Sequence, residues 1–294
     1  MNDRLQQLLQ PKKPEFKNFI LRLDGQPKSS KTTLALTTSL QCPPPATWDA
    51  KKPTVLKDIM WMTFEPNALM YPASRGVTVA NQLDWSDESL TLADLKPAIQ
   101  ALPAAAEQYR AQGVTTVVVD TLSAFNRFLL REIIERPTYE KDMDRIRAYG
   151  RVDEMHYLLF DSLRAMKMNI VGIVHLQAFQ PFGEDGGNTP AALAMKAQAE
   201  KQTVKLEANQ VAGMRTDYVP DIRPKPAGHW ARLSDAVLVA KPRQVTVRAG
   251  VQEMKYEFIA QTTDGEFSAG GRWALPPIND GYLRPHIEAK YNQK

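Results

Sequence analysis

The chain has 294 residues, a net charge of +4, an apolar fraction of 43% and a charged fraction of 24%, a composition that excludes a chain disordered throughout. Its single cysteine, Cys42, excludes an intramolecular disulfide and a cysteine-based zinc site. Because it has neither the apolar run of a signal peptide nor about 20 consecutive apolar residues, we expect a cytoplasmic protein that is not secreted and spans no membrane.

Residues 1–15 combine a short amphipathic stretch with prolines and lysines, and we interpret them as an N-terminal arm. A core domain over residues 16–294 follows. An apolar-rich run over residues 16–23 predicts a strand, and residues 32–40 have the composition of a helix. The core is therefore expected to begin with a strand, a glycine turn and a helix.

Residues 42–58 are rich in proline and lysine and predict a surface excursion, and residues 59–64 predict a short strand. Leucine and isoleucine recur at helical spacing over residues 90–112. An uninterrupted β-branched run over residues 114–119 ends at Asp120. Such a run is typical of a strand buried on both faces of a parallel sheet.

Two more helices are predicted over residues 124–135 and 152–168, joined by a charged connector over residues 137–151. Residues 169–174 predict another buried strand, which ends at His175. Because strands alternate with helices, the sequence predicts an α/β domain with a doubly wound, mostly parallel sheet.

The pattern changes after this strand. Residues 178–230 are polar, punctuated by glycine and proline and rich in Lys and Arg, which predicts a long basic loop with a helix-prone middle over residues 191–208. Closing strands joined by hairpins are predicted within residues 234–275. The runs that predict them cover residues 236–240, 245–248 and 256–262.

The segment from Gly25 to Thr32 reads Gly-Gln-Pro-Lys-Ser-Ser-Lys-Thr and matches the P-loop pattern G-x-x-x-x-G-K-[ST] except at its second glycine, where Ser30 stands. In a P-loop, backbone N–H groups and the positive end of the following helix hold a phosphate. Lys31 is expected to reach the β- and γ-phosphates. The predicted cofactors are ATP and Mg²⁺, and the predicted nucleotide-binding residues are Gly25, Gln26, Pro27, Lys28, Ser29, Ser30, Lys31, Thr32 and Thr33.

A magnesium ion on the nucleotide needs oxygen ligands, and we expect them from the Thr32 hydroxyl and from Asp120. Asp120 ends a predicted buried strand and precedes Thr121, which is typical of a Walker B aspartate. A strand-end aspartate is also a common helix N-cap. Beside the P-loop, the magnesium role is favoured.

Hydrolysis further requires a group that activates water, and the candidate is Glu65, at the end of the strand predicted over residues 59–64. A glutamate before a proline is otherwise a surface turn residue. His175 and Gln177 close the last core strand, where a polar side chain can sense the γ-phosphate. The predicted catalytic residues are thus Lys31, Glu65, Asp120, His175 and Gln177.

The order of these motifs resembles that of the phage-encoded RecA-core P-loop ATPases, which are phage nucleotide-binding or AAA-domain proteins. Some of them act in single-strand annealing and recombination. The resemblance covers nearly the whole chain, and its specific parts are the P-loop and the Walker B segment. It is carried by Gly25 to Thr32, Phe64-Glu65-Pro66, Trp85, residues 118–122, Ala148-Tyr149-Gly150-Arg151, Ile173-Val174-His175, Asp235-Ala236-Val237, residues 256–261 and Gly271-Arg272-Trp273.

The resemblance implies a RecA-like P-loop NTPase fold that closes with C-terminal β-hairpins. It also implies DNA-stimulated ATP hydrolysis, binding to single-stranded DNA and assembly into homo-oligomeric rings or filaments. The role would be in phage recombination, annealing or replication in the host cytoplasm, with a single-strand-binding protein as a further partner. Two features depart from the family pattern: Ser30 in place of glycine, and the long loop after His175.

In RecA-like filaments two loops on the carboxyl-terminal side of the sheet face the central axis, and basic residues mixed with aromatics there suit single-stranded DNA. By position the DNA-binding candidates are Arg145, Arg147, Tyr149, Arg151, Lys196, Lys201, Lys205 and Arg215. Hydrolysis in such assemblies is often completed by a basic residue of the neighbouring subunit. The candidates for this role are Lys241, Arg243 and Arg272.

Three alternative functions remain open. Ser30 favours a nucleotide-binding scaffold that has lost hydrolysis. A helicase or packaging-type motor shares the same core. A small-molecule kinase would need a lid and an acceptor site, and neither is recognisable in the sequence.

Overall fold

The computed structural model describes residues 18–135, 145–179, 217–248, 251–260, 270–271, 275–278 and 281–292. In chain order the elements are β1 (Ile20–Gly25), α2 (Lys31–Leu36), η1 (Pro45–Thr47), β2 (Thr54–Thr63), α3 (Met70–Ser74), β3 (Val77–Asp84), α4 (Leu92–Ala111), β4 (Thr116–Asp120), α5 (Leu122–Leu130), η2 (Arg131–Glu135), α6 (Arg145–Ala165), β5 (Asn169–Phe179), β6 (Asp217–Pro220), α9 (Pro224–Leu233), β7 (Ala236–Arg248), β8 (Val251–Ile259), β9 (Gly270–Gly271) and α10 (Arg284–Asn292).

The sheet is mostly parallel and has the strand order β3-β2-β4-β5-β1-β7-β8. All neighbours from β3 to β7 pair in parallel, and β8 returns antiparallel to β7. Strand β5 lies between β1 and β4. The predicted fold class, a RecA-like α/β domain with a doubly wound, mostly parallel sheet, is confirmed. Of the predicted C-terminal hairpins, the described residues contain the one formed by β7 and β8.

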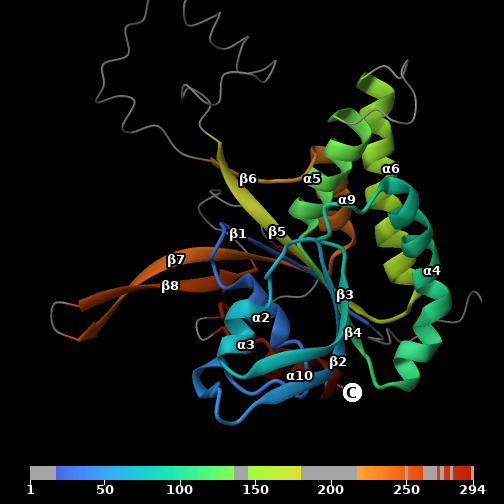
Figure 1. Cartoon of the computed structure of the whole chain (residues 1–294). Helices are drawn as coiled ribbons and strands as arrows, with labels where there is room; N and C mark the ends of the chain where they lie inside the picture. Colours follow the sequence, from blue (N-terminus) through green and yellow to red (C-terminus); the bar gives the residue numbers. More distant parts are fainter. Residues whose placement is uncertain are drawn as a thin grey trace, which may run out of the picture.

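Helices cover both faces of the sheet, as Figure 1 shows: α4, α5, α6 and α9 lie on one side, α2, α3 and α10 on the other. Strand β4 lies between these two helix layers, so its side chains are buried on both faces of the sheet. Val117 and Val119 pack into the core under α4, α5 and α6, whereas Val118 packs into the opposite core with Leu34 of α2. All five residues of β4 are buried.

A buried ion pair on β1 supports the strand that leads into the P-loop. Arg22 Nε donates to Asp24 Oδ1 at 2.8 Å, and the two side chains are 2% and 1% exposed. Arg22 Nη1 also donates to the carbonyl oxygen of Ala227 in α9 at 2.7 Å. Arg22 therefore joins α9 to the strand that leads into the P-loop.

Several expected elements differ from the structure. The predicted loop over residues 178–230 ends in ordered elements, β6 and most of α9, and the predicted connector over residues 137–151 is helical from Arg145 onward. Strand β7 runs through Pro242 as one strand instead of two, because β8 pairs with it on both sides of the proline. The sheet edge β3 and helix α10 were not predicted. The N-terminal arm (residues 1–15) and the helix predicted over residues 191–208 lie outside the described residues.

Within the described ranges, no helix combines the length and the apolar composition that crossing a lipid bilayer requires.

Candidate functional site

The loop between β1 and α2 has the curvature of a phosphate cradle. A Cβ atom on Gly25 would lie 2.4 Å from Ser29 Oγ and 2.7 Å from the Ala240 side chain, so glycine is required there. Lys28 and Ser30 have φ angles of 65° and 61°. The serine that replaces the second glycine of the motif therefore adopts the left-handed conformation that glycine favours.

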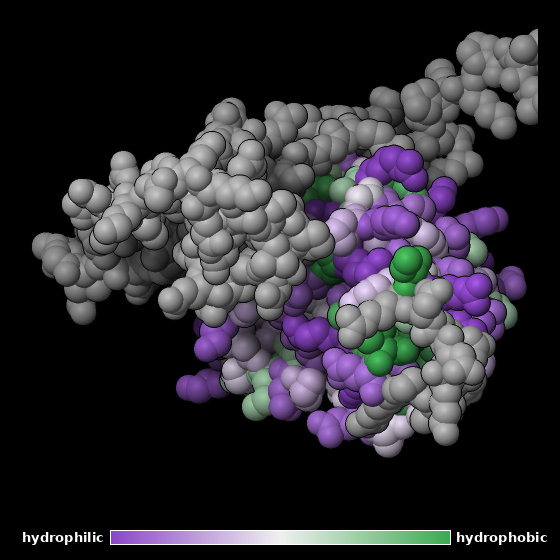
Figure 2. Space-filling model, turned by 90° about the horizontal axis from the view of Figure 1, so that it is seen from above, coloured by the Kyte–Doolittle hydropathy of each residue, from purple (hydrophilic) through white to green (hydrophobic). Residues whose placement is uncertain are grey.

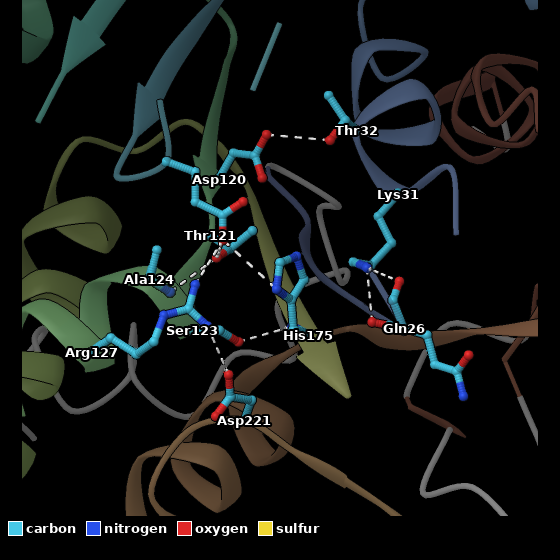
Figure 3. A network of polar contacts seen from close by, with 12 residues as sticks. Gln26, Lys31, Thr32, Asp120, Thr121, Ser123, Ala124, Arg127, His175 and Asp221 are labelled. Carbon is cyan, nitrogen blue, oxygen red and sulfur yellow. Dashed lines mark hydrogen bonds and ion pairs between the residues drawn. The ribbon is translucent and has the colours of Figure 1, made fainter. Parts of the chain in front are cut away.

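Lys31 folds back into this loop. Its Nζ donates to the carbonyl oxygens of Gly25 (2.8 Å) and Gln26 (2.6 Å) and to Ser29 Oγ (3.2 Å). Burial lowers the pKa of Lys31 to about 8, although the charges of Asp120, Asp24 and Glu65 oppose this shift. The ammonium is thus mostly protonated at neutral pH and lies at the base of the loop (Figure 3).

The predicted magnesium ligands lie together. The Thr32 hydroxyl donates to Asp120 Oδ2 at 3.3 Å, although 88 residues separate the two (Figure 3). Burial, and then the charge of Glu65, raises the pKa of Asp120 to about 7. The described residues contain no group of three or more His, Cys, Asp or Glu side chains arranged around a metal ion. One hydroxyl and one carboxylate suit Mg²⁺, which usually takes its remaining ligands from phosphates and water.

Glu65 follows β2, which pairs with β4 on the side away from β5. Its Oε1 accepts a hydrogen bond from the Thr121 hydroxyl at 3.0 Å and one from Arg127 Nη2 at 3.1 Å. The Phe64 N–H donates to the carbonyl oxygen of Asp120, which fixes the end of β2 beside the end of β4. The predicted water-activating glutamate and the predicted magnesium aspartate are therefore neighbours.

The two residues that were predicted to close the last core strand separate in the structure. His175 Nδ1 lies 3.7 Å from Glu65 Oε1, and the backbone N–H of His175 donates to Ser123 Oγ at 2.9 Å. Burial and the charges of Lys31 and Arg127 lower the pKa of His175 to about 4, so its ring is neutral at pH 7. Gln177 is exposed on the part of β5 that pairs with β6, where it does not line the cavity described next.

A cavity of about 800 Å³ joins these groups. Its lining includes Pro27, Lys28, Ser29, Ser30, Lys31, Thr32, Thr33, Glu65, Asp120 and His175. Aromatic and apolar side chains that the sequence analysis missed line it elsewhere, among them Tyr71, Pro72, Tyr256 and Phe258. Tyr71 stands six residues after Glu65, so its nearness to a predicted site residue was visible in the sequence. Tyr256 comes to the cavity only because β8 pairs with β7.

The remaining candidates fall into three groups. Arg145, Arg147, Tyr149 and Arg151 lie in the first two turns of α6, and the Tyr149 ring packs under the Arg223 guanidinium, 4.3 Å from it. Lys241 and Arg243 lie on β7 opposite Glu257 and Lys255, the latter a cavity residue. The others, Lys196, Lys201, Lys205, Arg215 and Arg272, lie outside the described residues.

Replacing Ser30 with glycine is expected to raise the free energy of unfolding by ~0.5–1 kcal/mol. The gain is the relief of the left-handed backbone less the entropy that glycine loses on folding. Urea denaturation measures it, and Ser30→Ala, which keeps the Cβ atom, is the matched control and should show no gain. A loss of stability in Ser30→Gly would contradict the prediction.

A family model described as an AAA domain matches residues 21–219, more than half of the chain. No curated protein matches the chain. Solved structures that match include a KaiC-like protein from the hyperthermophilic archaeon Pyrococcus horikoshii OT3, with 9% sequence identity and a TM-score of 0.37 over 88% of this chain and 83% of that one.

Proposed function

The chain belongs to the AAA-domain family of nucleotide-binding ATPases, and from this premise we propose that it binds and hydrolyses Mg-ATP and acts on single-stranded DNA in recombination, annealing or replication. The observation that carries the nucleotide part is the contact between Thr32 and Asp120. This contact places a hydroxyl and a carboxylate together at the wall of a cavity that Lys31 also lines.

In this proposal, different residues of the cavity bind different parts of the nucleotide. Backbone N–H groups of the P-loop and the start of α2 hold the phosphates, and Lys31 moves its ammonium from the loop carbonyls to the β- and γ-phosphates. Thr32 and Asp120 would hold magnesium, which neutralises charge on the phosphate oxygens when it is bound. Tyr71 and Tyr256 offer aromatic surface for the base.

Glu65 is the base in this proposal. It takes a proton from the attacking water, whose oxygen forms a bond to the γ-phosphorus. The bond from that phosphorus to the β–γ bridging oxygen breaks, and the electron pair leaves with ADP. In this proposal His175, which is neutral and lies beside Glu65, contacts the γ-phosphate. Its backbone N–H donates to Ser123 Oγ at the start of α5.

The DNA part of the proposal is supported by location and charge. One end of the molecule, the upper end in Figure 1, contains the end of α5, the start of α6 and the pairing of β5 with β6. Figure 2 looks down on this end, where the described surface is mostly hydrophilic with small hydrophobic patches. Arg147 is exposed there. A homo-oligomeric ring or filament, and a single-strand-binding protein as partner, belong to the same proposal.

The test is ATP turnover by the wild-type protein and by Lys31→Ala, each with and without single-stranded DNA. We expect wild-type turnover that DNA stimulates, and a loss of about a hundredfold in the variant, because a charge on the transferring phosphate loses its partner. Turnover that is equal in both proteins and indifferent to DNA would refute the proposal. Arg110→Ala, at the far end of α4, is the control and should behave like wild type.

Ser30 supports one second candidate, a scaffold that binds nucleotide without hydrolysing it. In that case the wild-type protein binds ATP in calorimetry but shows no ATP turnover, and the Ser30→Gly variant hydrolyses ATP. Absence of turnover in both proteins would remove Ser30 as the reason.

A further inference from the structure

The carboxylate of Glu65 is held through one of its two oxygens. Oε1 accepts from Thr121 Oγ1 at 3.0 Å and from Arg127 Nη2 at 3.1 Å, and it faces His175 Nδ1 at 3.7 Å. Among the described residues, no group bonds to Oε2. Glu65 itself lines the cavity.

The arginine that holds Oε1 is itself anchored. Arg127 Nη1 donates to Asp221 Oδ2 at 3.0 Å (Figure 3). The planar guanidinium therefore bridges the carboxylates of Glu65 and Asp221. Asp221 lies between β6 and α9, and its N–H donates to the carbonyl oxygen of His175 at 2.7 Å. Helix α5, the end of β2 and the turn before α9 therefore meet at one side chain.

This bridge contributes to geometry more than to stability. The Arg127 side chain is 54% exposed, and ion pairs at that exposure add little to the free energy of folding. Arg127 is not among the residues that line the cavity. Thr121, the N-cap of α5, fixes the other side of Oε1, because its hydroxyl also accepts the Ala124 N–H.

We propose that Arg127 is a positioning residue for ATP hydrolysis: with its guanidinium held by Asp221, it fixes Oε1 of Glu65 so that Oε2 meets the attacking water. The proposal rests on the role of Glu65 as the base. It also makes the turn between β6 and α9 part of the hydrolytic machinery, because a shift of Asp221 moves the arginine and with it the carboxylate.

The test is steady-state kinetics of Arg127→Ala. We expect kcat to fall about tenfold, because a misplaced base loses alignment with its water, while the KM for ATP and the Kd for Mg-ATP stay at their wild-type values. Arg127→Lys keeps the charge but not the fork and should be intermediate. Asp221→Asn should lower kcat in the same direction by a smaller factor. Arg131→Ala, four residues further along the chain at the start of η2, is the matched control with wild-type kcat, because Arg131 pairs with Glu132 and not with Glu65.

A double variant separates positioning from a merely structural role. In Glu65→Gln/Arg127→Ala, kcat should equal that of Glu65→Gln alone, because an arginine that acts through Glu65 has nothing left to position. Wild-type or raised kcat in Arg127→Ala, or a further loss in the double variant, would overturn the inference. If Glu65→Gln turned over ATP as wild type does, the role of Glu65 in the proposed function would fail first, and this inference with it.

Discussion

Replacing Glu65 with glutamine is expected to lower kcat for ATP by ~10²–10⁴-fold, the range that a positioned general base contributes. The amide oxygen can still accept the hydrogen bonds of Thr121 and Arg127, so the local structure is retained. What the amide cannot do is take a proton from water. The Kd for Mg-ATP is therefore expected to stay close to the wild-type value.

Single-turnover hydrolysis and calorimetry measure the two quantities separately. Glu107→Gln is the matched control, since Glu107 is an exposed residue of α4. It removes the same charge away from the cavity and should leave both kcat and Kd unchanged. Equal turnover in Glu65→Gln and Glu107→Gln would assign the base to another group.

Replacing Arg22 with methionine should lower the free energy of unfolding by ~3–5 kcal/mol, the usual effect of removing one partner of a buried ion pair. The change leaves the Asp24 carboxylate buried without its partner and leaves the Ala227 carbonyl oxygen without its donor. The desolvation cost of the remaining charge, not the lost attraction, is the larger part of this effect.

Urea denaturation of three proteins tests this explanation. The double variant Arg22→Met/Asp24→Leu removes both charges, and we expect it to recover most of the stability that Arg22→Met loses. A double variant as unstable as the single one would show that the bond to Ala227 matters more than the ion pair. A loss below ~1 kcal/mol in Arg22→Met, the range of exposed pairs, would contradict the prediction.

Local sequence patterns were enough for the P-loop and for most of the core. A strand, a glycine turn and a helix follow one another between Ile20 and Leu36, and an unbroken β-branched run before Asp120 identifies a strand with two buried faces. The helical spacing of apolar residues in α4 was also sufficient, despite Pro97 and Pro103 inside the helix.

Local sequence patterns did not predict the elements whose strand pairing depends on segments far away in the chain. Strand β3 is buried at Val77 and Val79 but alternates exposed with half-buried residues from Ala80 onward. It lies at the sheet edge, where β2 is its partner. Pro242 and its charged neighbours interrupt the apolar run of β7, yet β8 holds both halves in one ladder. Helix α6 begins at Arg145, in a stretch whose charge alone indicated a connector.

The sequence by itself determined the fold class, and it predicted Lys31, Asp120 and Glu65 as site residues, which the structure brings to one cavity. Only the tertiary structure decided that Thr32 and Asp120 touch, because that contact depends on β5 being inserted between β1 and β4. It also decided that Arg127 joins Glu65 to Asp221, across separations of 62 and 94 residues. Periodicity reports which face of an element is buried, whereas the order of strands in a sheet is set by contacts between segments far apart in the chain.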